Sequence, residues 1–337
     1  MQARQKSDWR LNAALSALVL ALMAASLITG PAGLSARTAL QALWSGDGVA
    51  GIIVRDIRLP RTLLAALIGA TLGLSGAALQ GLFRNPLAEP ALFGAPQAAA
   101  AASSFVIAFG LLPATSLLVP VAGMLGALVS VGALVLIAGP RTSLTVILLA
   151  GLALAAFAGA MTALILNLAP NPFIALEVAF WLLGSLEDRS RDHLTIAAPF
   201  MILGWIVLLS QARAFRALTL GDDAAVSLGV DLQRTRLAVV LGTAFGVGAA
   251  TAVAGAIGFV GLVAPHLVRR HVQSDPARIM LPAALAGAAL LLAADIAVRI
   301  VPSAIELKVG VVTALIGVPF FLFMIFSERR WLEGEPS

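Results

Sequence analysis

Long apolar runs are the feature that most limits how this chain can fold. Residues 11–30, LNAALSALVLALMAASLITG, carry no charge over a length that can cross a bilayer, for which ~17–25 mainly apolar residues suffice. Of all residues, 60% are hydrophobic and 12% charged, against about 25% charged in soluble domains. Backbone polar groups in lipid must be paired within the protein, and a helix pairs them within one apolar run. The sequence therefore predicts an all-α polytopic membrane protein.

Ten spanning segments are expected within a single transmembrane domain, residues 1–337. They are 11–30, 62–82, 96–110, 113–138, 143–167, 193–211, 236–254, 257–272, 279–298 and 307–326. The third and eighth are short. AGAIG at 254–258 fits a tight turn or a kink, and we predict a turn because one helix over 236–272 would be too long for a bilayer. A cleaved signal peptide is the alternative for the first segment, although a signal core is only ~7–15 residues long.

The distribution of basic residues supports an even number of spans. With the N-terminus inside, fourteen of the 22 lysines and arginines fall on the inner side and eight on the outer side. This excess agrees with the positive-inside rule. Both termini are therefore expected in the cytoplasm, with membrane lipid around the helices.

The sequence lacks the residues that several kinds of functional site require. There is no cysteine, and the only lysines are Lys6 and Lys308, so no phosphate-binding GxxxxGK[ST] loop exists. The three histidines form no HExxH motif, and no metal site is predicted. No run of five basic residues suggests nucleic-acid binding. Ser75 lies in a GxSG string like that of intramembrane serine proteases, but no histidine is expected at its depth, and a small packing serine is favoured.

Small residues line one face of the second segment. Gly69, Gly73 and Ala77 follow one another at four-residue spacing, which places them on the same side of a helix. Such faces allow close approach of two helices in a membrane. A packing role is therefore expected for these residues.

The longest polar inner segment covers residues 212–235. Gly221 is followed by Asp222 and Asp223, which suit the positive end of a helix dipole, and Gly229 suits a helix stop. A helix of about two turns is predicted here, either as a plain connector or as an element that docks into a groove of a soluble partner.

The stretch LFRNPLAEP, residues 82–90, interrupts the apolar chain. Pro86 and Pro90 each disfavour helix at the residue before them, so the helix must break. Irregular backbone at membrane depth is tolerated only inside protein or along a water-filled path.

Six ordered strings resemble one family. RLPR (58–61), LSGAALQGLFRNPLAEP (74–90), GDDAAVSLGV (221–230), GAIGFVGLVAPHLVR (255–269), ADIAVR (294–299) and ELKVGVVTALIGVPFF (306–321) resemble the FecCD-type permease subunits of bacterial ABC importers for iron chelates, heme and vitamin B12. The resemblance implies ten spans per subunit, a homodimer around a central pathway, two cytoplasmic ATPase subunits and a periplasmic binding protein. ATP and magnesium would bind the ATPase, with no cofactor on this chain, in the bacterial inner membrane.

The resemblance also suggests roles for particular residues. It assigns ATPase coupling to Gly221, Asp222, Asp223, Ala224, Ala225, Ser227, Leu228 and Gly229. It assigns binding-protein docking to Arg58, Arg61 and Arg299, although Arg58 and Arg61 can also act as interfacial anchors and Arg299 can pair with Asp295 along its helix. A cytoplasmic gate is implied at Asn85 and Leu87. A second gate segment falls on Thr142 and Ser143 or on Leu144 and Thr145, depending on alignment. Lys308 departs from a proline usual in the family.

The expected function is an ATP-driven permease, not itself an enzyme, that imports heme. The segments RLPRTLLAALIGA and LSGAALQGLFRNPLAEPAL resemble the sequences of heme permeases most. Ferric siderophore is the second substrate and vitamin B12 the third. An ATP-independent secondary transporter is a different class, but it would place ionisable residues at mid-membrane for ion coupling, and the spans carry almost none apart from Asp295.

Overall fold

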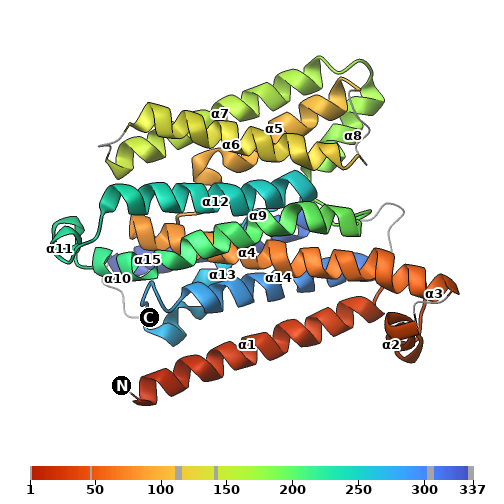
Figure 1. The fold of residues 1–337 in the computed structure, drawn as a ribbon, viewed down its shortest axis with the longest axis horizontal. Helices are drawn as coiled ribbons and strands as arrows, with labels where there is room; N and C mark the ends of the chain where they lie inside the picture. Colours follow the sequence, from red (N-terminus) through yellow and green to blue (C-terminus); the bar gives the residue numbers. More distant parts are fainter. Residues whose placement is uncertain (1, 46–47, 111–115, 140–142, 302–306, 333–337) are drawn as a thin grey trace.

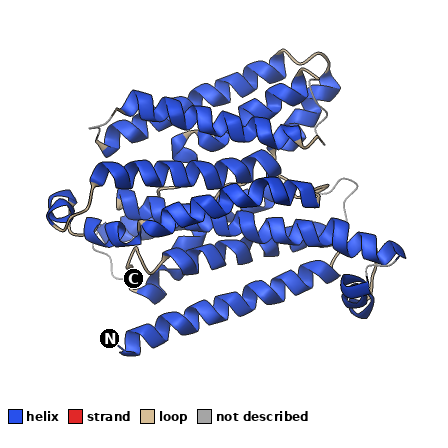
Figure 2. Cartoon of the chain, in the orientation of Figure 1, coloured by secondary structure: helices blue, strands red, loops and turns tan. Residues whose placement is uncertain are grey.

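The structure, a computed structural model, describes residues 2–45, 48–110, 116–139, 143–301 and 307–332. Its described part is helical and contains no strand (Figure 2). The long helices are α1 (Gln2–Ile28), α4 (Leu59–Phe83), α6 (Leu118–Ala138), α7 (Leu144–Asn167), α9 (Arg191–Ser210), α12 (Leu232–Ala254), α14 (Met280–Ile300) and α15 (Val309–Leu332). The shorter ones are α2 (Ala36–Ser45), α3 (Gly48–Ile52), α5 (Ala95–Ala108), α8 (Pro172–Leu182), α10 (Ala212–Leu218), α11 (Asp222–Ser227) and α13 (Val260–Arg269).

The long helices run side by side as one bundle (Figure 1). The short helices α10 and α11 lie at one end of the bundle, together with the first turn of α1, and α2 and α3 lie at the other (Figure 1). We call these the α11 end and the α2 end. From the distribution of basic residues, the α11 end is expected to face the cytoplasm.

Each of the ten predicted segments coincides with one helix. Eight described helices are long and apolar enough to cross a membrane, and the two predicted short segments appear as α5 and α13. At 254–258 the predicted turn is confirmed, because Gly255 has a φ of +73° and separates α12 from α13. A φ of this sign suits glycine, which has no Cβ to clash with the backbone.

Several features of the helix order were not predicted, among them the short helix α2. The second span begins earlier than residue 62, because α3 and a π-helix at Ile53–Arg58 lead directly into α4. Helix α8 was missed because its eleven residues are too few for a spanning segment. Its local signal is nevertheless present: Asn171 caps the helix by accepting a hydrogen bond from the amide of Ile174 at 3.0 Å, and Pro172 follows at the first helical position.

Helices α4 and α12 form the centre of the bundle. In each, 78% of the most apolar window is buried within the chain, against 6% for α1. Helix α4 packs on α14 through bare backbone: a Cβ added to Gly69 would lie 2.8 Å from the Cα of Ala288. Gly73 meets the backbone of α14 in the same way, and Ala77 belongs to the same buried surface. The predicted small-residue packing face is confirmed.

Candidate functional site

Helix α11 projects from the α11 end of the bundle and confirms the predicted short helix (Figure 1). Gly221 precedes it with a φ of +101°. Gly229 follows it with a φ of +84°, donating its amide to the carbonyl of Val226, while the amide of Val230 reaches the carbonyl of Ala225. This pair of hydrogen bonds is a Schellman motif, which satisfies the last carbonyls of a helix.

Two large apolar side chains at the end of α11 are exposed and not covered by the rest of the described chain. Val226 is 55% exposed and Leu228 is 65% exposed, whereas Ala225 faces inward and is buried. Exposed aliphatic side chains on a short capped helix suit insertion into a groove of another protein. The geometry therefore fits the docking alternative better than a plain connector.

The two aspartates at the start of α11 have different surroundings. Asp222 forms ion pairs with Arg84, at 3.0 Å, and with Arg236, also at 3.0 Å. The Asp223 side chain is exposed, and its backbone carbonyl accepts a hydrogen bond from the Ser227 hydroxyl. Asp222 thus connects α11 to the end of α4 and to the first turns of α12.

The LFRNPLAEP segment turns back into the bundle. Helix α4 ends at Phe83, and Arg84 takes a left-handed conformation with a φ of +51°. Asn85 then closes a turn, accepting a hydrogen bond from the amide of Leu87 through its side-chain oxygen at 2.9 Å. Six residues after Arg84, Pro90 contacts the surface of α13: a Cβ on Gly261 would lie 2.9 Å from the Cδ of Pro90.

The depth of this return follows from its neighbours on α4. A Cβ built on Gly261 would also lie 3.0 Å from the carbonyl oxygen of Leu72. Leu72 is eleven residues before the end of α4. At 1.5 Å per residue the segment therefore re-enters the bundle by about 16 Å. Pro90 and Glu89 border a cavity of about 110 Å³ whose lining also includes Leu72 and Thr251. Irregular backbone buried in this way agrees with the interruption expected from the sequence.

The second predicted gate segment begins α7. The hydroxyl of Ser143 caps this helix by accepting a hydrogen bond from the amide of Val146, and Leu144 and Thr145 form its first turn. Thr142 lies outside the described residues. Further along α7, a Cβ on Gly151 would lie 3.1 Å from the Cα of Phe93, so α7 contacts the re-entrant segment. The gate roles of Asn85, Leu87, Ser143, Leu144 and Thr145 remain predictions.

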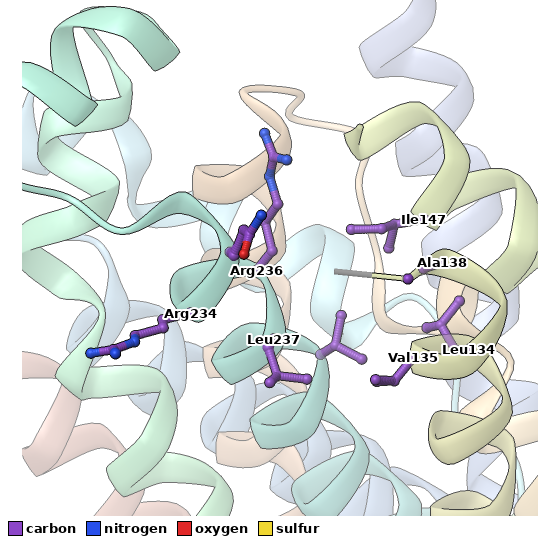
Figure 3. Close-up of a pocket in the computed structure, with 10 residues that line it drawn as sticks. Leu134, Val135, Ala138, Ile147, Arg234, Arg236 and Leu237 are labelled. Carbon is purple, nitrogen blue, oxygen red and sulfur yellow. The ribbon is translucent and has the colours of Figure 1, made fainter. Parts of the chain in front are cut away.

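A cavity lies beside the start of α7 (Figure 3). It has a volume of about 350 Å³ between α12 and the α6–α7 pair, with a mainly aliphatic wall that includes Leu134, Ile147 and Leu237. The Arg234 side chain points away from the cavity (Figure 3) and pairs with Asp231 at 3.1 Å. The polar residues of its lining are Gln233, Arg234 and Arg236.

At the α2 end, Asp295 is completely buried and holds two arginines. Arg61 donates to one carboxylate oxygen with an Nε–Oδ1 distance of 2.9 Å, and Arg299 pairs with the other at 2.9 Å. Arg299 also donates to the carbonyls of Ser26 and Thr29 at the end of α1. The pairing of Arg299 with Asp295 along their helix is present, and Arg61, 234 residues before Asp295, joins it.

The third predicted docking arginine is also engaged within the chain. Arg58 is 4% exposed and donates to the carbonyl oxygens of Leu27 and Ile28, at 2.9 and 2.8 Å. Carbonyls at a helix C-terminus lack partners within the helix, so this contact caps α1. Docking by Arg58, Arg61 and Arg299 stays a prediction, and in the isolated chain all three stabilise the junction of α1, α4 and α14.

The loop before α9 meets the start of α15 through Lys308. Its amino group pairs with the Glu187 carboxylate at 2.6 Å, so the lysine has a partner within the chain. In the same loop, burial lowers the pKa of Arg189, and the neighbouring Asp188 and Glu187 act in the opposite direction. This part of the α2 end is thus a mixed-charge surface.

In the described part of the chain, the residues considered for a serine protease site or a metal site are not brought together. Ser75 is fully buried and its hydroxyl has no hydrogen-bond partner, so nothing in the described part of the chain activates it as a nucleophile. Among the described residues, no group of three histidine, aspartate or glutamate side chains is placed to hold a metal ion.

Comparison with known proteins extends over nearly the whole chain. The FecCD transport family model matches residues 18–327. The chain is 37% identical over 323 residues to the hemin transport system permease protein HmuU of Yersinia pestis, covering 94% of this chain and 95% of that protein. It is 40% identical over 281 residues to the cobalamin import system permease protein BtuC of Halobacterium salinarum, covering 82% and 74%.

A solved structure has the same fold. It is described as an inward-facing conformation of a metal-chelate type ABC transporter, and it superimposes with a TM-score of 0.82 at 28% identity. The match covers 95% of this chain and 99% of that one. With a family match from residue 18 to residue 327 and relatives matched over most of their length, the chain belongs to the FecCD transport family.

Proposed function

We propose that this FecCD permease imports heme from the periplasm into the cytoplasm. The observation that carries the substrate is the similarity to a hemin permease along 94% of the chain. The amino-acid sequences of residues 58–70 and 74–92 also favour heme as the substrate. Heme is bulky and largely apolar, which suits a pathway between helices that bear few charges.

The energy for transport comes from a partner in this proposal. The sequence lacks the phosphate-binding loop of an ATPase, and α11 presents Val226 and Leu228 to solvent. Two ATPase subunits, each binding ATP and magnesium, would receive one α11 from each copy of a homodimer. A periplasmic binding protein would deliver substrate to the α2 end.

Two other substrates fit the same family. A ferric siderophore is the second candidate and vitamin B12 the third, the latter supported by 40% identity to a cobalamin permease over a shorter stretch. A secondary transporter is disfavoured because the buried carboxylate of Asp295 is neutralised by two arginines and is not available to bind a coupling ion.

The test of function is reconstitution with all partners. The permease is expressed with its cognate ATPase and purified, and transport into proteoliposomes is measured with heme, a ferric siderophore and cobalamin in parallel, each with the cognate binding protein. Heme uptake that requires ATP, together with stimulation of ATP hydrolysis by heme-loaded binding protein, is expected. A hydrolysis rate insensitive to heme would reject heme as substrate. Uptake that follows a proton gradient without any bound ATPase would reject the ABC assignment.

The gate assignment predicts that cross-linking at Asn85 stops transport. The chain has no cysteine, so Asn85→Cys or Leu87→Cys introduces a single reactive thiol. Cross-linking the two copies there is expected to lower ATP-driven uptake to background, because a closed gate blocks the path below the cargo. Cleaving the cross-link with a reducing agent is expected to restore uptake. Val129→Cys is the control, because Val129 lies on α6 and is 72% exposed. Full uptake with the Asn85 cross-link in place would show that the segment is an ordinary loop.

A further inference from the structure

We propose that Asp222 is the positioning residue that links α11 to the re-entrant segment 84–90 and to α12. The inference rests on the proposed function, in which a partner ATPase moves α11. Both oxygens of the carboxylate are used: Oδ1 accepts from Arg84 Nη2 at 3.0 Å and Oδ2 accepts from Arg236 Nη2 at 3.0 Å. One side chain on the helix that meets the ATPase therefore holds two helices of the bundle.

Arg84 is the connection to the re-entrant segment. It directly follows Phe83, the last residue of α4, and its φ of +51° is a strained conformation for a non-glycine residue that persists only where the surroundings hold it. The Arg84 side chain is held by the Asp222 pair and by a contact of 3.5 Å with the carbonyl of Leu218, the last residue of α10. Asn85 follows directly, so a displacement of Asp222 acts on the first residue of the predicted gate.

Arg236 is the connection to the core. Its side chain is 15% exposed and lies in the second turn of α12, one of the two most buried helices. Further along α12, Val247 and Thr251 line the 110 Å³ cavity that Glu89 and Pro90 also border. The two branches from Asp222 therefore lead to two segments that line one cavity, so that in this proposal a movement of α11 is passed to both segments together.

Asp231 offers a matched control in the same loop. It also pairs with an arginine, Arg234 at 3.1 Å, but that partner is three residues away and 88% exposed. Asp231 caps α12 by accepting a hydrogen bond from the amide of Arg234, and asparagine caps helices equally well. Asp231→Asn thus removes the same charge from the same loop and leaves the helix start and the Asp222 connections intact.

The experiment compares Asp222→Asn with Asp231→Asn in the full transporter, reconstituted with its ATPase and binding protein. The readouts are the ATPase retained on purification, the rate of ATP hydrolysis, and the substrate transported per ATP. Asp222→Asn is expected to keep the ATPase bound and hydrolysing while transport per ATP falls at least about fivefold, the lower range of measured coupling between sites. Asp231→Asn is expected to stay within about twofold of the unmodified protein, because an exposed pair contributes little.

A second variant tests the link from its other side. Arg84→Gly removes the guanidinium and leaves a residue that adopts a positive φ without strain, so the helix end is retained. It is expected to lower transport per ATP as much as Asp222→Asn does, and the double variant is expected to be no worse than either single one, because both remove one connection. Asp222→Glu, which can still reach both arginines, is expected to recover most of the loss.

The outcomes separate this inference from the proposed function. If the unmodified chain retains no ATPase, the proposed function and the inference fall together. Should the unmodified chain transport by ATP hydrolysis while Asp222→Asn and Asp231→Asn behave alike, only the inference is overturned. Loss of bound ATPase in Asp222→Asn would also overturn it, since Asp222 would then be a docking residue and not a link.

Discussion

Replacing Asp295 with asparagine is expected to destabilise the folded chain by about 3–5 kcal/mol, the usual cost of removing one partner from a buried ion pair. The carboxylate has no exposed surface, and its partners Arg61 and Arg299 are themselves almost fully buried. Asparagine preserves the shape but leaves two guanidinium charges uncompensated in a low-dielectric site. The measurement is thermal unfolding of the purified protein in detergent, followed by size-exclusion chromatography of heated samples.

Two further variants test the physical reason for this loss. Asp56→Asn removes the partner of Arg191 from an ion pair in which both side chains are more than half exposed, and it is expected to cost at most about 1 kcal/mol. Replacing the whole set, with Asp295→Leu, Arg61→Met and Arg299→Met together, is expected to recover much of the stability, because apolar groups of similar volume can replace a buried ion network. Equal unfolding temperatures for Asp295→Asn and Asp56→Asn would contradict the structural role of the cluster.

The fold was predictable because its main signals are local. Apolar runs marked the spans, Gly255 marked the turn between α12 and α13, and Gly221 with Asp222 marked the short helix α11. In each case the residues that decide the structure lie within a few positions of one another. Helix α8 and the π-helix at 53–58 were missed because hydropathy sums over ~20 residues cannot resolve segments of eleven or six.

The candidate site was only partly predictable for the opposite reason. The sequence allowed Arg299 to pair with Asp295 because the two are one helical turn apart. It could not show that Arg61, 234 residues away, shares the same carboxylate, or that Asp222 meets Arg84 and Arg236. The prolines in LFRNPLAEP predicted an interruption, but the return of Pro90 to the level of Leu72 depends on packing against α13. Contacts between distant segments need the fold before they can be seen.

Replacing Gly73 with valine is expected to prevent the close packing of α4 and α14 and to cost about 3 kcal/mol, the upper end of the usual range for overpacking. A Cβ at this position would lie less than 3.0 Å from the backbone of Ala283, and backbone cannot move aside as a flexible side chain can. The helices would have to separate along a surface that also includes Gly69 and Gly287. Thermal unfolding and limited proteolysis of the purified protein measure the effect.

Gly132→Val on α6 is the matched control, because among the described residues no atom outside the adjoining helix backbone lies within 4 Å of a Cβ added there. Its expected effect is small, and alanine at the same position is expected to stabilise by up to about 1 kcal/mol through helix propensity alone. The consequence of Gly73→Val reaches further than stability, since α4 carries Arg61 near one end and is followed by Arg84 at the other. If the variant folds with α4 displaced, both the Asp295 cluster and the Asp222 link are expected to weaken. Unfolding at the same temperature as Gly132→Val would show that the α4–α14 contact is looser than its backbone geometry requires.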